Sequence, residues 1–258
     1  RWVLRGSKNE RAVFWTRQGI KLFTGVMLVF GVAAIWFDDP TTLTTGLGWN
    51  TSLLATTGVI SVVSTGPINA TWNLPGSGSW SASLASNWNP AVPNGTGTVA
   101  NFGTAITGNS TVSVDTAKTV GKITFNNANS YTITGTATDT ITLADSAATP
   151  QISVTLGSHT ISAPLILAQN TSVSTAPGTT LTISGGITGG AQSLTKTGTG
   201  TLNLDGPQSY AALNATAGAT TVDGAVGSGA AVVSVTGTGT TLKFGLSLLH
   251  ISEPTRLR

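Results

Sequence analysis

Three features of the sequence predict an all-β chain that coils as a right-handed parallel β-helix. The first feature is the composition: only 8% of the residues are charged, whereas an ordinary globular domain carries roughly 25%. The mean hydropathy is positive, which excludes disorder, because a disordered chain needs low hydrophobicity and high net charge. Segments rich in Thr, Val and Ile alternate with glycines, as in strands joined by turns. The third feature, a repeat of about 20 residues, indicates the architecture.

Two series of short segments, each with an apolar residue flanked by polar ones, share this period. One is centred on Ile123, Ile141, Ile161, Leu181, Leu202, Val222 and Leu242, and the other on Val112, Ile133, Ile152, Val173, Leu194, Leu213 and Val233. Alternate side chains of a strand point to opposite faces, so one coil per repeat would line an interior with the apolar set. We expect about seven rungs over residues 111–245. A β-sandwich would need no constant period. The first series from Ile141 onward, six residues in all, should form one interior column.

The N-terminal part has the pattern of an export signal. The apolar run Leu22–Phe37 follows a basic cluster and precedes Asp38 and Asp39. We expect an apolar signal or anchor helix within residues 1–40, although the run is shorter than the roughly 20 residues of a spanning helix. Cleavage after residues 32–34 or after 68–70 stays open, as does upstream reading-frame translation, because residue 1 is Arg. Residues 41–71 would be a linker.

One family resemblance emerges from the repeats. Residues 185–206, and within them Leu194–Leu202 (LTKTGTGTL), resemble the autotransporter-associated β-strand repeat, also called the passenger-associated transport repeat. Gln208–Tyr210 and Thr220–Val222 stand where that repeat has its NxY and TTV elements. Pro207-Gln208 and Ala211-Ala212 depart from its Gly- and Asn-rich turn, so one corner should differ. The resemblance implies an exported passenger-type β-helix with no catalytic residues to carry over.

A Trp-rich segment precedes the rungs. Trp72, Trp80 and Trp88 predict an N-terminal cap over residues 72–110, since an open solenoid end exposes core and unpaired backbone. The alternative is a sugar-stacking platform, with Trp80 and Trp88 as exposed glycan contacts. The stretch Trp72–Phe102 also looks like the start of large repeat proteins of the same family.

Residues for site chemistry are scattered on the predicted register. Glycoside cleavage needs two convergent carboxylates or a metal site, but the acids fall on different rungs or corners, and His159 falls at a corner. There is no cysteine for thiolate metal sites. These acids are Asp115, Asp139, Asp145, Asp205 and Asp223. We therefore expect no catalytic residue, no metal site, no cofactor and no enzymatic activity.

Two further classes of partner are not favoured by the sequence. Six of the twelve basic residues precede the apolar run and the body is nearly neutral, so the net charge of +3 does not indicate nucleic-acid binding. An outward Thr column could bind ice, but it loses its regularity. The column would comprise Thr140/Thr142, Thr160/Ser162 and Thr180/Thr182, followed by Asn203, Asp223 and Lys243.

The last thirteen residues depart from the repeat. Residues 246–258 introduce Pro254 and several charges, and they resemble a translated sequencing adapter, which we expect to be a scar. The body predicts a non-enzymatic structural or adhesive protein, secreted or on a bacterial cell surface or outer membrane. Its partners would be surface polysaccharide or host and matrix surfaces, and it would meet the membrane only through the N-terminal segment or a missing C-terminal translocator. A glycan-binding module is the alternative; ice binding and a polysaccharide-degrading β-helix enzyme are less expected.

Overall fold

The computed structural model describes residues 66–81, 87–225 and 232–245 in full, together with six short strands before residue 65. Contacts divide the chain into two units, residues 1–65 and 66–258. The predicted scar at 246–258 lies outside the described residues.

The strands of the N-terminal unit form three antiparallel pairs. These are β1 (Val13–Thr16) with β2 (Gly19–Leu22), β3 (Met27–Phe30) with β4 (Ala33–Trp36), and β5 (Leu47–Asn50) with β6 (Ser61–Ser64). The helix expected in Leu22–Phe37 is not confirmed, because the described residues of that run lie in strands, chiefly β3 and β4. Their Val, Ile, Phe and Trp side chains favour strands over helix. Among the described residues, no helix is long and apolar enough to cross a membrane.

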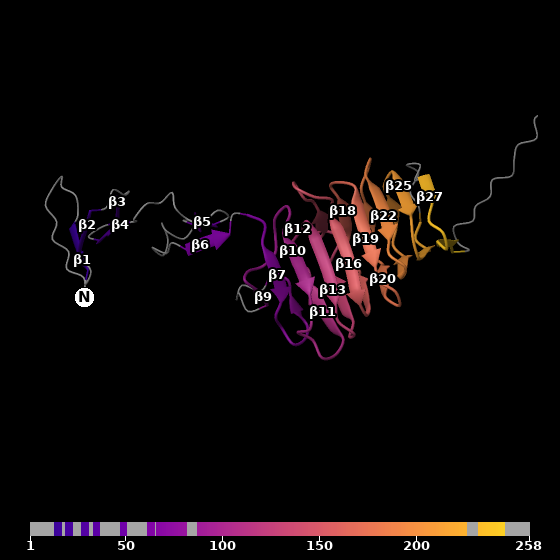
Figure 1. Ribbon diagram of the computed structural model, residues 1–258, viewed down its shortest axis with the longest axis horizontal. Coiled ribbons are helices and arrows are strands. Elements are labelled where there is room, and N and C mark those ends of the chain that lie inside the picture. The colour runs from indigo at the N-terminus through magenta and orange to yellow at the C-terminus, as the bar shows by residue number, and fades with distance from the viewer. Residues whose placement is uncertain are drawn as a thin grey trace, which may run out of the picture. The chain divides into compact units, whose positions relative to one another are not determined.

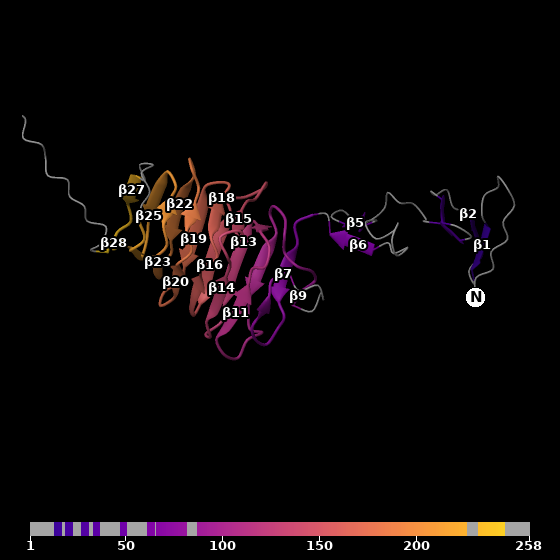
Figure 2. The same ribbon diagram turned by 180° about the vertical axis from the view of Figure 1, so that it is seen from behind.

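The second unit is a parallel β-solenoid of about six turns, whose strands stack side by side in three sheets (Figures 1 and 2). It is all-β, with no helix in the part of the chain described in full. The predicted count of about seven rungs is not confirmed. The first sheet contains β7 (Asn69–Trp72), β10 (Val99–Phe102), β13 (Lys122–Asn126), β16 (Gln151–Leu156), β19 (Thr171–Thr175), β22 (Ser193–Thr197), β25 (Ala212–Ala215) and β27 (Val232–Val235), with β9 (Trp88–Asn89) at its edge.

The other two sheets are built in the same way. The second contains β8 (Gly78–Ser79), β11 (Ser110–Ser113), β14 (Tyr131–Thr134), β17 (Ser158–Ile161), β20 (Thr180–Ile183), β23 (Thr201–Leu204), β26 (Ala219–Val222) and β28 (Thr241–Phe244). The third is shorter, with β12 (Lys118–Val120), β15 (Ile141–Leu143), β18 (Leu165–Leu167), β21 (Ile187–Thr188) and β24 (Gln208–Ser209). Within each of the three sheets all pairings are parallel except that of β9 with β7.

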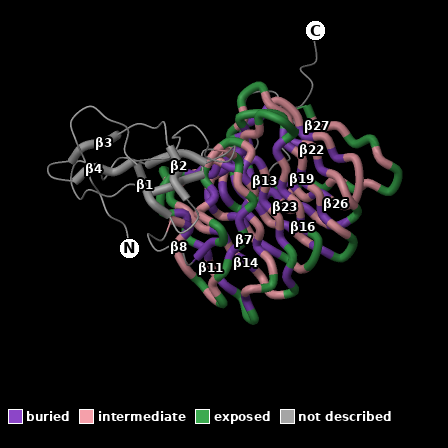
Figure 3. Tube along the Cα trace, turned by 60° about the vertical axis from the view of Figure 1, so that its left-hand side comes forward, coloured by how far each residue is buried: buried purple, intermediate pink, exposed green. Residues whose placement is uncertain are grey.

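The alternation predicted from the sequence decides which side chains face the interior. In β20, Leu181 and Ile183 are fully buried, while Thr180 and Thr182 are half-buried on the outer face. Stacked coils repeat this pattern, so a continuous apolar core runs inside the solenoid and exposed residues gather at the corners (Figure 3). Burying apolar side chains in this way is worth about 1.5–3 kcal/mol for each Leu, Ile or Phe.

The coils are less regular than the predicted period. Ile133 pairs with Ile161 and Leu194 pairs with Leu213, so the first of these coils takes up clearly more of the chain than the second. The third sheet and corners of variable length account for the difference, because each adds or removes residues without changing the ladder. The two predicted series therefore pass from one sheet to another along the chain.

The predicted single interior column is wrong in its membership. Ile141 pairs with Leu165 in the third sheet, and Ile161 shares a column with Ile183, Leu204 and Val222. The neighbouring column contains His159, Leu181, Leu202, Thr220 and Leu242. Five of the six predicted residues are nevertheless buried, and Leu242 packs against the same core. The inward orientation was right, and the register was not.

Glycine permits one tight corner between the first and second sheets. Gly198 has φ +72°, and a Cβ atom placed there would lie 2.3 Å from the backbone oxygen of Thr175 on the previous coil. Both the positive φ and the close approach exclude larger residues. This corner follows the LTKT segment and carries the chain from β22 to β23.

Candidate functional site

The three tryptophans lie inside the first coil. Trp72, Trp80 and Trp88 are no more than 1% exposed and surround Phe102, with Trp72 and Trp88 edge to face at 5.3 Å between ring centroids. The indole nitrogen of Trp80 donates to the Pro93 oxygen at 3.0 Å, and that of Trp88 donates to the Trp80 oxygen at 2.9 Å. The rings of Trp80 and Trp88 are thus held by packing on their faces and by a hydrogen bond at their polar edge.

This geometry bears on the two interpretations of the Trp segment. A sugar-stacking platform needs an accessible ring face, and Trp80 and Trp88 offer none, so the proposed glycan contacts do not fit this arrangement. Strand β9 pairs antiparallel with β7, through Trp72 and Trp88, along the outer edge of the first sheet. That pairing covers an edge that would otherwise expose backbone donors and acceptors. The segment also supplies the strands β7, β8 and β10 of the solenoid itself.

Asp115 and Lys118 form an ion pair beside this end. The Lys118 side chain is buried, and its Nζ lies 3.4 Å from Asp115 Oδ1 and 2.9 Å from the Thr116 oxygen. Burial raises the pKa of Asp115, but hydrogen bonds from Ser79 and Ser81 and the Lys118 charge outweigh it and lower the pKa to about 2. The carboxylate therefore stays ionised, and it links strand β8 to the corner after β11.

The remaining acids divide into two groups. Asp139 accepts from the Thr136 hydroxyl, and Asp145 accepts backbone N–H groups of its own turn. Asp205 and Asp223 lie on neighbouring coils, since the residues before them, Leu204 and Val222, are paired. Burial, and secondarily the charge of Asp223, raises the pKa of Asp205.

The predicted register also places Asp205 and Asp223 on different, consecutive rungs, and the structure adds that they directly follow two paired residues of adjacent strands. The available signal was local, because each acid directly follows the last apolar residue of its strand. No group of three acidic, His or Cys side chains able to hold a metal occurs among the described residues.

Lys196 is a buried cation that the sequence analysis did not identify. Lys196 stands two residues after the buried Leu194 on β22, so both side chains face inward. The Lys196 side chain is 0% exposed. Its Nζ donates to three backbone oxygens, at 2.8 Å to Thr197, 2.7 Å to Gly198 and 3.2 Å to Ala217 on the next coil. Burial lowers the pKa of Lys196 to about 8. Three acceptors match the three donors of an ammonium group, so the residue joins two coils at a corner.

His159 is likewise an interior residue and not the corner residue that the predicted register implied. It lies in β17, 1% exposed, with its ring stacked on Phe125 at 4.6 Å. Nδ1 accepts the Tyr131 N–H at 3.1 Å, so the proton is assigned to Nε2, which donates to the Leu156 oxygen at 2.8 Å. Burial lowers the pKa of His159. The neutral ring fills the core and satisfies two backbone groups.

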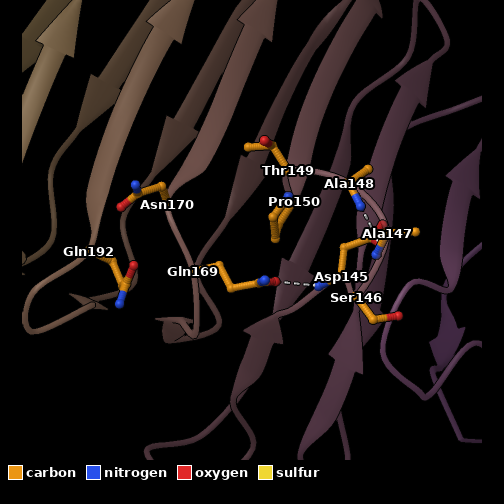
Figure 4. A pocket seen from close by; sticks show the side chains of 9 residues that line it. All are labelled: Asp145, Ser146, Ala147, Ala148, Thr149, Pro150, Gln169, Asn170 and Gln192. Atoms are coloured by element: carbon orange, nitrogen blue, oxygen red, sulfur yellow. Dashed lines mark hydrogen bonds between the residues drawn. The ribbon is translucent and has the colours of Figure 1, made fainter.

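A shallow depression of about 510 Å³ lies at the corners that lead from the third sheet to the first (Figure 4). Gln169 accepts the Asp145 N–H at 2.7 Å, and Asn170 accepts the Ser193 N–H at 3.0 Å, so both amides supply hydrogen bonds between coils. The lining offers amides, hydroxyls and one carboxylate without a nucleophile paired to a base. It consists of residues 145–150 with Gln169, Asn170 and Gln192.

The outer faces of the two long sheets carry columns of short polar side chains. Thr142, which the predicted Thr column included, instead pairs with Ile166 in the third sheet. The second-sheet column begins earlier than expected and comprises Thr111, Thr132, Thr160, Thr182, Asn203, Thr221 and finally Lys243. A first-sheet column comprises Thr71, Asn101, Thr124, Ser153, Ser174 and Thr197.

Comparison with known proteins adds no relative. No family model matches the chain, and neither the curated proteins nor the solved structures that were searched contain a match.

Proposed function

We propose that this chain is part of a non-enzymatic structural or adhesive shaft, secreted or displayed on a bacterial cell surface in the manner of an autotransporter passenger. The proposal rests on one observation: the solenoid combines a continuous apolar core with continuous columns of polar side chains on its outer faces. Coil after coil repeats the same ladder, and each outer column presents Thr, Ser or Asn at the same position.

The stacked coils of the interior suit a structural role. Nearest-neighbour stacking gives a solenoid a stability that accumulates coil by coil, and here the cross-coil contacts of Lys196 and Asn170 reinforce the corners. We also expect the coil to be right-handed, since parallel strands joined by a crossover are almost always connected in that hand.

The exterior suits contact with neutral surfaces. The two outward columns described above contain hydroxyl and amide groups, with Lys243 as their charged member. Such groups can donate and accept hydrogen bonds to polysaccharide or to matrix protein without a strong field. Any adhesive contact would then use the sheet faces, since Trp80 and Trp88 are buried. A membrane connection would run through the N-terminal segment or a C-terminal translocator.

An adhesion assay on the full chain tests this proposal. The purified protein should bind at least one neutral polysaccharide or matrix surface, without releasing sugar products from a panel of polysaccharides. Placing lysines at Thr160 and Thr182 should weaken that binding, whereas lysine at the corner residue Ser146 should leave it unchanged. Protease treatment of intact producing cells should degrade the protein. Turnover of a polysaccharide, or a location confined to the cytoplasm, would refute the proposal.

A further inference from the structure

The corner between β16 and β17 is tied to the preceding coil by a titratable side chain. Strand β14 pairs with β17 only at Thr132 and Ile133, whereas its pairing with β11 begins one residue earlier, at Tyr131. The Tyr131 N–H donates to Nδ1 of His159, at 3.1 Å. At this position of the ladder an imidazole nitrogen therefore takes the place of a backbone acceptor.

The corner itself lies at the surface, although the His159 ring is buried. Leu156 and Ser158, on either side of the turn, are exposed. The bond that ties the turn to the next coil is long, at 3.4 Å from the Thr180 nitrogen to the Gly157 oxygen. Only a short and weakly tied corner therefore separates the ring from water, and a local movement of this corner would hydrate it.

Protonation of His159 would turn an attractive contact into a repulsive one. In the neutral ring Nδ1 accepts a hydrogen bond, and Nε2 donates to the Leu156 oxygen at 2.8 Å. Both nitrogens of the protonated ring are donors. The bond to the Leu156 oxygen would persist, but the new N–H on Nδ1 would face the N–H of Tyr131. The backbone donor would then lose its acceptor inside the solenoid.

The surroundings of the ring offer an imidazolium no compensating charge. The elements packed against it contribute Phe125 from β13, Tyr131 from β14 and Leu181 from β20. Tyr131 is the titratable member of this set, and burial raises its pKa to about 12. Its hydroxyl donates to the Gly103 oxygen at 2.8 Å, so it stays neutral. A positive charge on His159 would therefore be buried without a partner, which is costly.

We propose that this corner is an acid-sensitive device: protonation of His159 opens the turn between β16 and β17 while the rest of the solenoid stays folded. The opening is local because each coil of a solenoid contacts only its neighbours, so a weakened corner does not disrupt distant coils. In the open form the imidazolium reaches water, and the rings of Phe125 and Tyr131 lose their cover. Acid would thus expose aromatic surface at one defined place on the shaft.

The pH range of the opening follows from the two forms of the corner. Burial lowers the pKa of His159 in the closed form, whereas the hydrated ring of the open form has the ordinary pKa of about 6.5. As the pH falls, the open form therefore takes up the proton first. Below about pH 6.5 its population should rise about tenfold per pH unit, until the pKa of the closed form is reached.

Hydrogen exchange followed by NMR on the full chain tests the proposal. Exchange rates measured between pH 7 and pH 4.5 are corrected for the intrinsic pH dependence of amide exchange. The amides of Tyr131 and Thr180 should lose protection about tenfold per pH unit below about pH 6.5. Those of β23 and β26 should keep their protection. The nitrogen chemical shifts of the His159 ring should report its protonation over the same pH range.

Two variants identify the source of the effect. His159→Gln retains an acceptor for the Tyr131 N–H but does not titrate, so it should abolish the pH dependence at this corner. His250→Gln is the matched control, because it removes the other histidine of the sequence, and the pH dependence should persist.

Three outcomes would overturn the proposal: protection at Tyr131 that does not change with pH, loss of protection in all three sheets together, or pH dependence that survives His159→Gln. If His159→Gln does not fold, the unmodified chain still decides the matter. Protonation of the His159 ring and loss of protection at Tyr131 must then follow the same pH dependence, and a mismatch would refute the assignment.

Discussion

Thr220 offers the sharpest test of the interior register. It lies on β26 with 1% exposure, between Leu202 and Leu242 in an otherwise largely apolar column, and its hydroxyl oxygen has no hydrogen-bond partner. Thr220→Val keeps the shape of the side chain and its β-branching while replacing the hydroxyl with a methyl group. The substitution should therefore remove the cost of an unpaired polar group without disturbing the packing.

The expected gain follows from two contributions. An unsatisfied buried hydroxyl costs about 1–3 kcal/mol, and the added methyl group contributes up to about 0.8 kcal/mol of burial. Allowing for partial relaxation of the hydroxyl in the native protein, we expect the variant to be more stable by about 1–2 kcal/mol. Because long repeat arrays can unfold coil by coil, the measurement should combine urea unfolding with hydrogen exchange at β23, β26 and β28.

The neighbouring residue supplies the matched control. Thr221 undergoes the same chemical change in Thr221→Val but lies on the outer face, in the column of Asn203 and Lys243. Its substitution should change stability by less than about 0.5 kcal/mol, as is usual at the surface. If Thr220→Val is destabilising, or if the two variants behave alike, then the assigned inward and outward faces of β26 are wrong.

Three other predictions concern the core. Leu202→Ala should cost about 3–4 kcal/mol by urea unfolding, since Leu202 is fully buried and its loss leaves a cavity, whereas Asn203→Ala on the outer face should cost far less; equal effects would contradict the register. Lys196→Met should destabilise the protein by about 1–3 kcal/mol at pH 7, because three backbone oxygens lose an ammonium donor; a neutral or stabilising result would show that the cost of burying the charge dominates. Lowering the pH below 6.5 should reduce stability, because unfolded His159 takes up a proton at its ordinary pKa while burial holds the folded pKa lower; His159→Gln should flatten this part of a pH–stability curve, and an unchanged slope would exclude His159 as its source.

Part of the candidate site could have been predicted from the alternation alone. Lys196 stands two residues after Leu194, and His159 stands two residues before Ile161, so each shares a face with an apolar core residue. The predicted register placed His159 at a corner instead, and the general rule that charged residues face water gave no reason to expect Lys196 inside. Both residues can be buried because backbone oxygens and amides satisfy their polar groups.

The tryptophans show a different limit. Composition indicated that they would cover apolar surface, and the structure confirms that they are buried. Whether a ring closes the end from outside or fills the first coil depends on strand pairing. The antiparallel contact of β9 with β7 joins Trp88 to Trp72, and no local pattern in the sequence specifies it.

The sequence by itself determined that this chain is a β-solenoid and that the apolar side chains of its repeats face the interior. Both follow from local rules, because a strand alternates its faces every residue and a repeated pattern needs a repeated neighbour. Only the tertiary structure decided which inward residues share a column, where the third sheet lies and how the coils differ in length. A ladder accepts corners of different length without changing its hydrogen bonds, so the coil from Ile133 to Ile161 can be much longer than the coil from Leu194 to Leu213. Spacing along the chain therefore identifies the class of fold, whereas the register follows from which corners close over the packed core.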